Sequence, residues 1–597
     1  MIKHRLIFRL ASVFGLILSV GAVSAQKDTI LQQEVEVVKA YRPTVIDANK
    51  INENPVIKDE EQKKPTFDYS ISSQPVFSTF SVKNLEAATI VGKPKEELGY
   101  GLVRLGVGNY NKPYAELFFN NNKAKNSIFG LHFKHLSSHG KIKLKGGDRV
   151  KAPFSENNAE MFLKHMFKSS VLSFNADFSH NGFNYYGYPG DSIPSVLTDA
   201  DPLWNNYTGT HQTFSRGGLN ISLTNAGESA TNTTLGFDFD YHYFGTKTGQ
   251  REHFAEFYVN FRKPGKPVSF LLDVGSEFSQ ADKIWNVTLS EVARRQQTWF
   301  VSKPAVRVGN ETINLKAGGT LWVVGDPDEK TALKLAPDVR LNFAPVKEII
   351  NVFAGIDGKL HHNHYSAIAY QNPFVDPEHD VRNHFEKFRF YGGFDGKFGP
   401  RTNFKIQADY SMFTGQPFYY LSALRMPTMG VIPGPLLVNN TFKVLYDDMD
   451  QLRFNAEIAH MVTDKFNLVI SGNYYKYTLN EQEKPWNLPE FDATLSLGYK
   501  ITDQLAVSTE VYVIGKREAM IWDLGLWDSP SSLAPATSIQ VIPLDTAIDL
   551  NFKATYEVTR KFSLFAQLNN FGFQQYERWL GYPVQSFNFL GGLSYSF

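Results

Sequence analysis

From about residue 98 to the carboxy terminus, apolar and polar residues alternate along the chain with a period of two. In residues 404–412 every even position is apolar and the odd positions are polar. The same pattern recurs in residues 235–243, 388–398, 466–474 and 505–513. A period of two places successive side chains on opposite faces of a β-strand. The pattern therefore predicts an all-β chain whose strands each have one apolar and one polar face.

The last strand shows this alternation most clearly. Apolar residues and glycine occupy every second position from Phe587 to Phe597, where the chain ends on an aromatic side chain. In a transmembrane barrel the outward face meets lipid, and aromatic side chains gather at the membrane interface. We therefore expect residues 587–597 to form a lipid-facing strand.

Short and long connections alternate between the expected strands. Membrane barrels have short turns at the inner end and longer loops at the outer end. Ten short turns, with a strand before the first and after the last, predict an antiparallel barrel of about 22 strands. These turns lie near residues 121–126, 168–171, 225–232, 264–267, 309–312, 345–347, 399–402, 463–465, 502–504 and 559–561. The expected outer loops are 138–157, 183–211, 281–296, 360–384, 414–449, 479–489 and 517–545, with short outer connections near Asn111, Thr246 and Asp326.

Composition supports this interpretation and excludes others. Mean hydropathy is −0.28, although aromatic residues make up 14% of the chain. Beyond the first thirty residues no apolar run is long enough for a membrane-spanning helix, which excludes a helical bundle. A net charge of +1 indicates no nucleic-acid partner, and the absence of cysteine excludes disulfides and thiolate metal sites.

The amino terminus resembles a secretory signal. Basic residues precede an apolar stretch from Leu10 to Val23, and small residues follow at Ser24 and Ala25. This order predicts a signal peptide over residues 1–25 that is cleaved after export. Residues 26–97 then form an amino-terminal segment, and residues 98–597 form the barrel. The expected location is the outer membrane of a Gram-negative cell, with outer-membrane lipid around the barrel.

The end of the chain resembles the end of TonB-dependent receptors. The resemblance lies in residues 568–572 (Leu-Asn-Asn-Phe-Gly), 576–583 (Tyr-Glu-Arg-Trp-Leu-Gly-Tyr-Pro) and 589–597. It implies a 22-stranded barrel and import driven by a TonB-type coupling protein of the inner membrane. Residues 31–40 look like the family's coupling segment, which implies that Val35, Val37 and Val38 add to a partner sheet as a strand.

The amino-terminal segment departs from that family. Its 72 residues are about half of a full plug domain, and Pro43 interrupts the strand pattern after Tyr41 and Arg42. A barrel of this size encloses a lumen that has to be closed. Three alternatives remain open: residues 26–97 form a reduced plug, outer loops fold inward, or a partner fills the lumen.

The expected outer loops are rich in aromatic residues, which suit the capture of a glycan or peptide. The same rings also suit an interfacial belt or packing between loops. Loop 414–449 is apolar as well, so we expect it to fold over the lumen or to bind a partner. The candidate ligand-binding residues are Tyr185, Tyr186, Trp204, Tyr419, Tyr420, Trp522 and Trp527.

The sequence indicates no cofactor, metal site or catalytic site. Five histidines gather near residues 361–384, but their spacing is not that of a structural metal site. No motif of nucleophilic, metallopeptidase or phosphate-binding chemistry stands out, which indicates a protein that is not an enzyme. We expect a receptor-like barrel that binds or takes up a ligand through its outer loops. The alternatives are a non-transporting structural or assembly subunit, partnered by an outer-membrane lipoprotein for example, and a passive porin.

Overall fold

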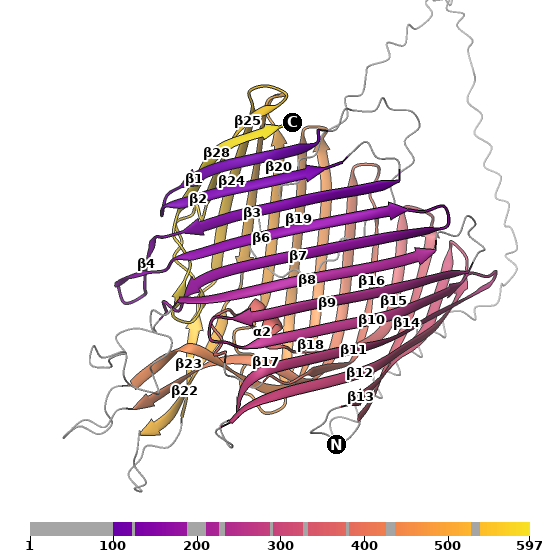
Figure 1. Ribbon diagram of the computed structural model, residues 1–597, viewed down its shortest axis with the longest axis horizontal. Helices are drawn as coiled ribbons and strands as arrows, with labels where there is room; N and C mark the ends of the chain where they lie inside the picture. The colour runs from indigo at the N-terminus through magenta and orange to yellow at the C-terminus, as the bar shows by residue number, and fades with distance from the viewer. Residues whose placement is uncertain are drawn as a thin grey trace, which may run out of the picture. The chain divides into compact units, whose positions relative to one another are not determined.

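The computed structural model describes residues 99–121, 126–187, 211–225, 233–286, 291–325, 332–377, 381–425, 436–526 and 538–597. All of them belong to one compact unit. Its main sheet has 24 strands; β22 and β23 form a hairpin attached to β17, and the other 22 strands form the barrel wall (Figure 1).

The wall consists of antiparallel strands that each pair with the next along the chain. Their bounds are β1 Gly101–Gly108, β2 Lys112–Asn120, β3 Ser127–Ser138, β6 Phe154–Met166, β7 Ser170–Asn184, β8 His211–Asn225, β9 Thr234–Thr246, β10 Arg251–Lys263, β11 Val268–Asn286, β12 Glu291–Gly309, β13 Ile313–Gly325, β14 Ala332–Val346, β15 Ile350–His361, β16 His384–Lys397, β17 Thr402–Arg425, β18 Leu436–Thr463, β19 Phe466–Leu479, β20 Phe491–Lys500, β21 Leu505–Ile514, β24 Ala547–Glu557, β25 Phe562–Asn569 and β28 Asn588–Ser596.

The connections contain the remaining elements. They are β4 Lys141–Lys143 with β5 Arg149–Lys151, α2 Tyr365–Gln371, β22 Arg517–Leu526 with β23 Ser538–Leu544, and β26 Glu577–Trp579 with β27 Tyr582–Pro583. No helix among the described residues is long and apolar enough to cross a membrane.

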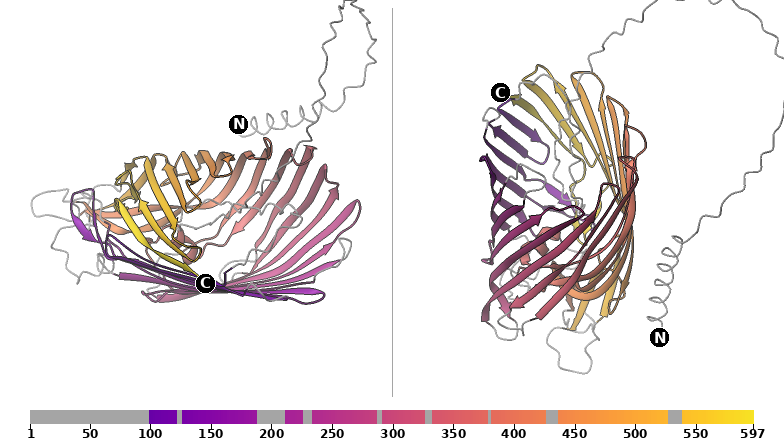
Figure 2. Two further views of the ribbon diagram at one scale, coloured as in Figure 1. Left: turned by 90° about the horizontal axis from the view of Figure 1, so that it is seen from above. Right: turned by 90° about the vertical axis from the view of Figure 1, so that its right-hand side faces the viewer.

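The first and last strands close the barrel. β1 pairs with β28 from Leu102↔Ser596 to Gly108↔Leu590. The amides of Tyr100 and Gly101 donate to the carbonyl of Phe597 at 2.6 and 3.1 Å, which ties the chain end to the first strand. Figure 2 shows the wall of strands curving round so that the last strands reach the indigo first strands. The predicted all-β barrel of about 22 strands is confirmed, and each predicted inner turn lies between two consecutive wall strands.

The two faces of the wall differ as the alternation predicts. Outward side chains such as Leu105, Val107 and Phe300 are apolar and highly exposed in the isolated chain, as lipid-facing residues should be. Side chains on the lumen face pair across strands instead. Arg453 donates to Asp409 at 2.7 Å, for example. The lumen is therefore polar.

The prediction of a loop is wrong for two segments, which are β-strand over most of their length. Residues 281–296 lie mainly in β11 and β12, and residues 414–449 lie mainly in β17 and β18. β17 and β18 continue past irregularities at Phe413/Gln416 and Leu421/Ala423, where the register shifts, and β11 and β12 continue past a shift between Asp282 and Ile284. Gly415, with a φ of 68°, lies at the first of them. The sequence pattern breaks at these bulges although the pairing resumes beyond them.

Candidate functional site: an outer cap across the barrel mouth

The connections at the end of the barrel away from the short turns pack into one structure, here called the outer cap. It comprises residues 185–187, 362–377 with α2, the outer ends of β17 and β18, and the hairpins β22–β23 and β26–β27. Figure 1 shows α2 within the ring of strands and β17, β22 and β23 gathered at one end. A buried apolar cluster joins these parts: Phe244, Tyr365, Ile368, Ala369, Val375, Val381, Tyr419, Leu421, Ala423, Phe442, Val444, Ala519, Ile521, Leu544, Leu580 and Tyr582.

Buried hydrogen bonds cross the cap from one side of the wall to the other. The side-chain amide of Asn440, in β18, donates to the carbonyl of Tyr185, directly after β7, at 3.4 Å. β7 and β18 lie halfway round the ring from each other. The hydroxyl of Tyr582 donates to the Asn440 carbonyl at 2.5 Å, and the ring of Tyr582 stacks on Phe374 at 3.6 Å. Three separate connections therefore meet at Asn440 and Tyr582.

β22 joins the hairpin β22–β23 to the rest of the cap. It runs parallel to the outer end of β17, from Tyr420↔Met520 onward, and so extends the wall over the mouth. The guanidinium of Arg517 donates to the carbonyls of Glu577 and Arg578 at 2.7 and 2.6 Å. Burial and the nearby Arg578 lower the pKa of Arg517 to about 10, so it remains charged at neutral pH.

A wall carboxylate anchors the short helix α2. Glu252, buried in β10, accepts hydrogen bonds from the amides of Tyr365 and Ser366 at 2.6 and 2.9 Å. The first amides of a helix have no partner within the helix, and the N-cap residue His364 supplies no side-chain bond. A carboxylate from the wall satisfies them and complements the positive helix end. The helix is thus held by the barrel.

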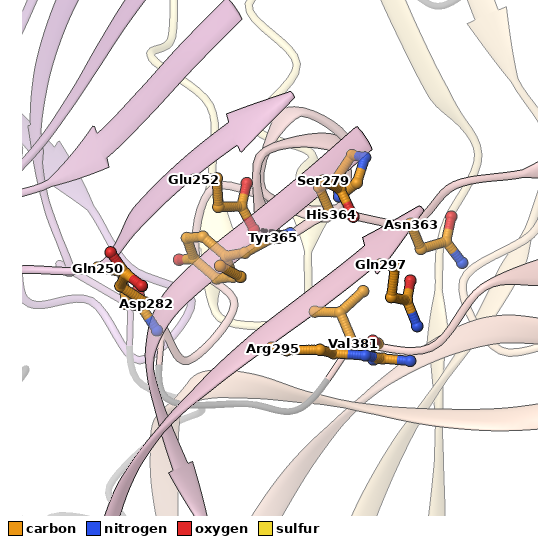
Figure 3. Close-up of a pocket in the computed structure, with 11 residues that line it drawn as sticks. Gln250, Glu252, Ser279, Asp282, Arg295, Gln297, Asn363, His364, Tyr365 and Val381 are labelled. Atoms are coloured by element: carbon orange, nitrogen blue, oxygen red, sulfur yellow. Dashed lines mark hydrogen bonds between the residues drawn. The ribbon is translucent and has the colours of Figure 1, made fainter. Parts of the chain in front are cut away.

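A small polar cavity lies beside this anchor, between β10, β11, β12 and residues 363–365 (Figure 3). Its volume is about 40 Å³, enough for water but far too small for a glycan or a peptide. Gln250 Oε1 and His364 Nε2 are buried there without a protein partner. Burial lowers the pKa of His364 to about 3, which keeps this imidazole neutral.

The structure brings together three of the residues predicted to bind a ligand. Tyr419 belongs to the cap cluster and Tyr186 packs against it. Tyr185 is fully buried beside them, with its ring centroid 6.5 Å from that of Phe374. Burial raises the pKa of all three hydroxyls. Tyr420 and Trp522 lie in a neighbouring cluster, with ring centroids 5.5 Å apart. Trp204, Trp527, Val35, Val37 and Val38 lie outside the described residues. The ligand-binding role of the aromatic residues and the energy-coupling role of the three valines stay predictions.

Sequence reasoning missed other members of the cap. Phe374, Phe442 and Tyr582 contribute as much ring contact as the predicted tyrosines. Tyr582 falls in the stretch that resembles the receptor family, but nothing in its neighbourhood indicates that it reaches across the mouth. The position of Tyr582 depends on pairing between strands that are separated by several hundred residues of the chain.

The cluster of histidines forms separate pairs. His361 stacks on His384 with ring centroids 4.2 Å apart, and His362 Nε2 lies 2.5 Å from Glu277 Oε2. The described residues contain no group of three or more side chains that could hold a metal ion.

Comparisons with solved structures identify the fold. The ferripyoverdine receptor of the Pseudomonas aeruginosa outer membrane matches with a TM-score of 0.59 and 13% identity, over 85% of this chain and 72% of that one. The siderophore receptor PirA from Acinetobacter baumannii matches with a TM-score of 0.60 and 10% identity, over 85% and 81%. The copper transporter OprC matches with a TM-score of 0.57 and 10% identity, over 85% and 82%.

These matches define the class. The described barrel has the fold of outer-membrane receptors, and its apolar outward band suits that membrane. The predicted resemblance to TonB-dependent receptors is therefore confirmed for the fold. No protein-family model and no curated protein sequence matches the chain.

Proposed function

We propose that the protein is an outer-membrane receptor that takes up a ligand through its outer connections. The observation that carries this proposal is the outer cap, an aromatic-rich structure above a polar lumen. Its hydrogen bonds join opposite sides of the wall. The structural neighbours are receptors and a transporter, which supports transport over enzymatic chemistry.

The cap must open for a ligand to reach the lumen. Tyr185 and Ile368 have no exposed surface, and Tyr582 is nearly as buried. Burial of one large apolar side chain contributes roughly 1.5–3 kcal/mol, so separating the cap requires a substantial input of free energy. Ligand binding at the outer surface and coupling from the inner membrane would together supply it.

Energy coupling is assigned to residues 31–40, with Val35, Val37 and Val38 pairing with a TonB-type partner. Residues 1–25 are proposed as a signal peptide that is removed on export. The test deletes residues 31–40 in a native cell and measures by mass spectrometry which compounds disappear from the medium. We expect at least one compound to be depleted by the parent strain and left in the medium by the deletion strain.

A deletion of residues 56–65 serves as a matched control, since it removes the same number of residues from the charge-rich stretch that ends at Pro65. It should leave depletion unchanged. Identical medium profiles for the parent strain and the 31–40 deletion strain would refute coupled uptake.

A second candidate is a non-transporting subunit of an outer-membrane assembly. The extent of the buried cluster favours it, because a cap packed like a protein core suits a barrel that stays shut. This candidate predicts a stoichiometric partner, such as a lipoprotein, in a pull-down from detergent-solubilised envelope. Recovery of the barrel alone would count against it.

A further inference from the structure

The hairpin β4–β5, in the outer connection between β3 and β6, carries an unusual concentration of positive charge. Within residues 141–151 there are five cations and one acidic residue, Asp148, although the whole chain is nearly neutral. All five cations are exposed: Lys141, Lys143, Lys145, Arg149 and Lys151. Figure 1 shows the hairpin projecting beyond the neighbouring strands.

The register places like charges directly opposite each other. Lys141 pairs with Lys151, and Lys143 pairs with Arg149. Like charges at directly opposed positions of an antiparallel pair destabilise it. None of these four side chains forms an ion pair with another described residue. Among the described residues, the hairpin thus holds on one face four cations that no carboxylate pairs with.

The backbone keeps this face in a defined geometry. The amide of Leu144 donates to the Asp148 carbonyl at 2.8 Å, and Gly147 turns the chain with a φ of 103°. The opposite face is apolar and buried, with Ile142 and Leu144 almost without exposed surface. Residues two apart on a strand are about 7 Å apart, so the four cations form a compact grid.

From this arrangement we propose that the cationic face of β4–β5 binds an anionic glycan at the cell surface. A polymer with repeated sulfate, phosphate or carboxylate groups can contact several cations of the grid at once, and clusters of lysine and arginine attract such polyanions. A lipid surface fits less well, because the apolar side chains of the hairpin are already buried. A nucleic acid fits less well because the face has no aromatic ring on which bases stack.

The inference stands apart from uptake, since it concerns binding by the closed barrel. It is tested on the purified full-length protein in detergent with three probes: a heparin oligosaccharide, neutral dextran and single-stranded poly-deoxythymidine. If four cations engage, heparin affinity should fall about 50-fold between 50 and 200 mM salt, by analogy with single-stranded polyanions. Dextran should not bind.

The decisive variant replaces Lys141, Lys143, Arg149 and Lys151 with glutamine. It should lose at least about ten-fold in heparin affinity and most of the salt dependence. A matched control replaces four exposed lysines at the inner turns with glutamine and should bind like the parent: Lys168, Lys263, Lys266 and Lys561. A gel shift on heating verifies that both variants are folded barrels.

Three results would overturn the proposal: parental heparin binding by the decisive variant, an equal loss in the control, or tighter binding of poly-deoxythymidine than of heparin. The last would assign the face to nucleic acid.

Discussion

At the scale of single residues, the seam between the first and last strands leaves no room for a side chain at Gly101. A Cβ there would lie 2.7 Å from the carbonyl oxygen of Phe118 and closer still to the Cζ atom of Phe597. Gly101→Ala should therefore destabilise the barrel by about 1–3 kcal/mol, as overpacking does. Thermal unfolding in detergent measures the change.

Gly217→Ala is the control for this substitution, because a Cβ at that strand position meets nothing within 4 Å. Equal unfolding temperatures for the two variants would show that the seam is not tightly packed.

Tyr582 makes two contacts, a hydrogen bond and a ring stack, and two different substitutions distinguish their contributions. Tyr582→Phe removes the hydrogen bond to the Asn440 carbonyl and should cost about 1 kcal/mol. Tyr582→Ala also removes the stack on Phe374 and should cost about 3–5 kcal/mol. The effect belongs to the cap, so it should appear as faster hydrogen exchange of the β22 amides while the wall strands stay protected.

Tyr474→Phe changes an exposed, outward-facing tyrosine and should leave exchange unchanged. If Tyr582→Ala also left the hydrogen exchange of the β22 amides unchanged, Tyr582 would not stabilise the cap.

Which aromatic residues form the cap could be predicted only in part. Tyr185, Tyr186 and Tyr419 stand out because aromatic residues cluster around them in the sequence. Their burial against Phe374, Phe442 and Tyr582 depends on strands from opposite sides of the ring. No local sequence pattern shows that residues of these strands meet.

At the scale of elements, α2 and its flanking residues should be sensitive to acid. The pKa of His364 is lowered to about 3 by burial and by the neighbouring His362, His242 and Arg295, whereas the unfolded value is 6.5. The unfolded chain therefore binds more protons between these two values. This contribution to stability is fully present above pH 6.5 and is lost progressively as pH falls towards 3.

His364→Gln should flatten the dependence of the free energy of unfolding on pH by an amount on the order of 1 to a few kcal/mol, whereas substitution of the exposed His139 should not. Parallel pH profiles for the parent and His364→Gln would contradict the assignment.

Elements were predictable where a strict period of two and a polar turn coincide, as around residues 399–402 and 502–504. Predictions failed where wall strands continue beyond a bulge. Residues 414–449 look like a loop because Gly415 and Pro417 interrupt the alternation, yet β17 and β18 resume pairing beyond them. A bulge changes the phase of the pattern without ending the sheet.

At the scale of the whole molecule, the cap predicts a barrel that conducts little current. A chain with residues 26–97 removed should still show low conductance in planar bilayers if the cap is sufficient to close the mouth. In that truncated chain, replacing residues 516–545, which contain β22 and β23, with a short Gly-Ser linker should raise conductance strongly, because the part of the cap that extends over the mouth is gone.

Large channels in the chain without residues 26–97 but with an intact cap would instead assign closure to the amino-terminal segment. Low conductance in both chains would show that neither is needed.

The pairing of β1 with β28 also has a consequence for biogenesis. β28 follows every other described wall strand in the chain and yet pairs with β1, so both edges of the described sheet remain unpaired until β28 has been synthesised. Unpaired edges promote aggregation. A chain truncated before β28 leaves β1 without its second described partner strand, so an exposed sheet edge persists even when the other described strands pair. Truncation within β28 should therefore be as damaging as the loss of a much longer piece, and the chain needs protection from aggregation until β28 has paired with β1.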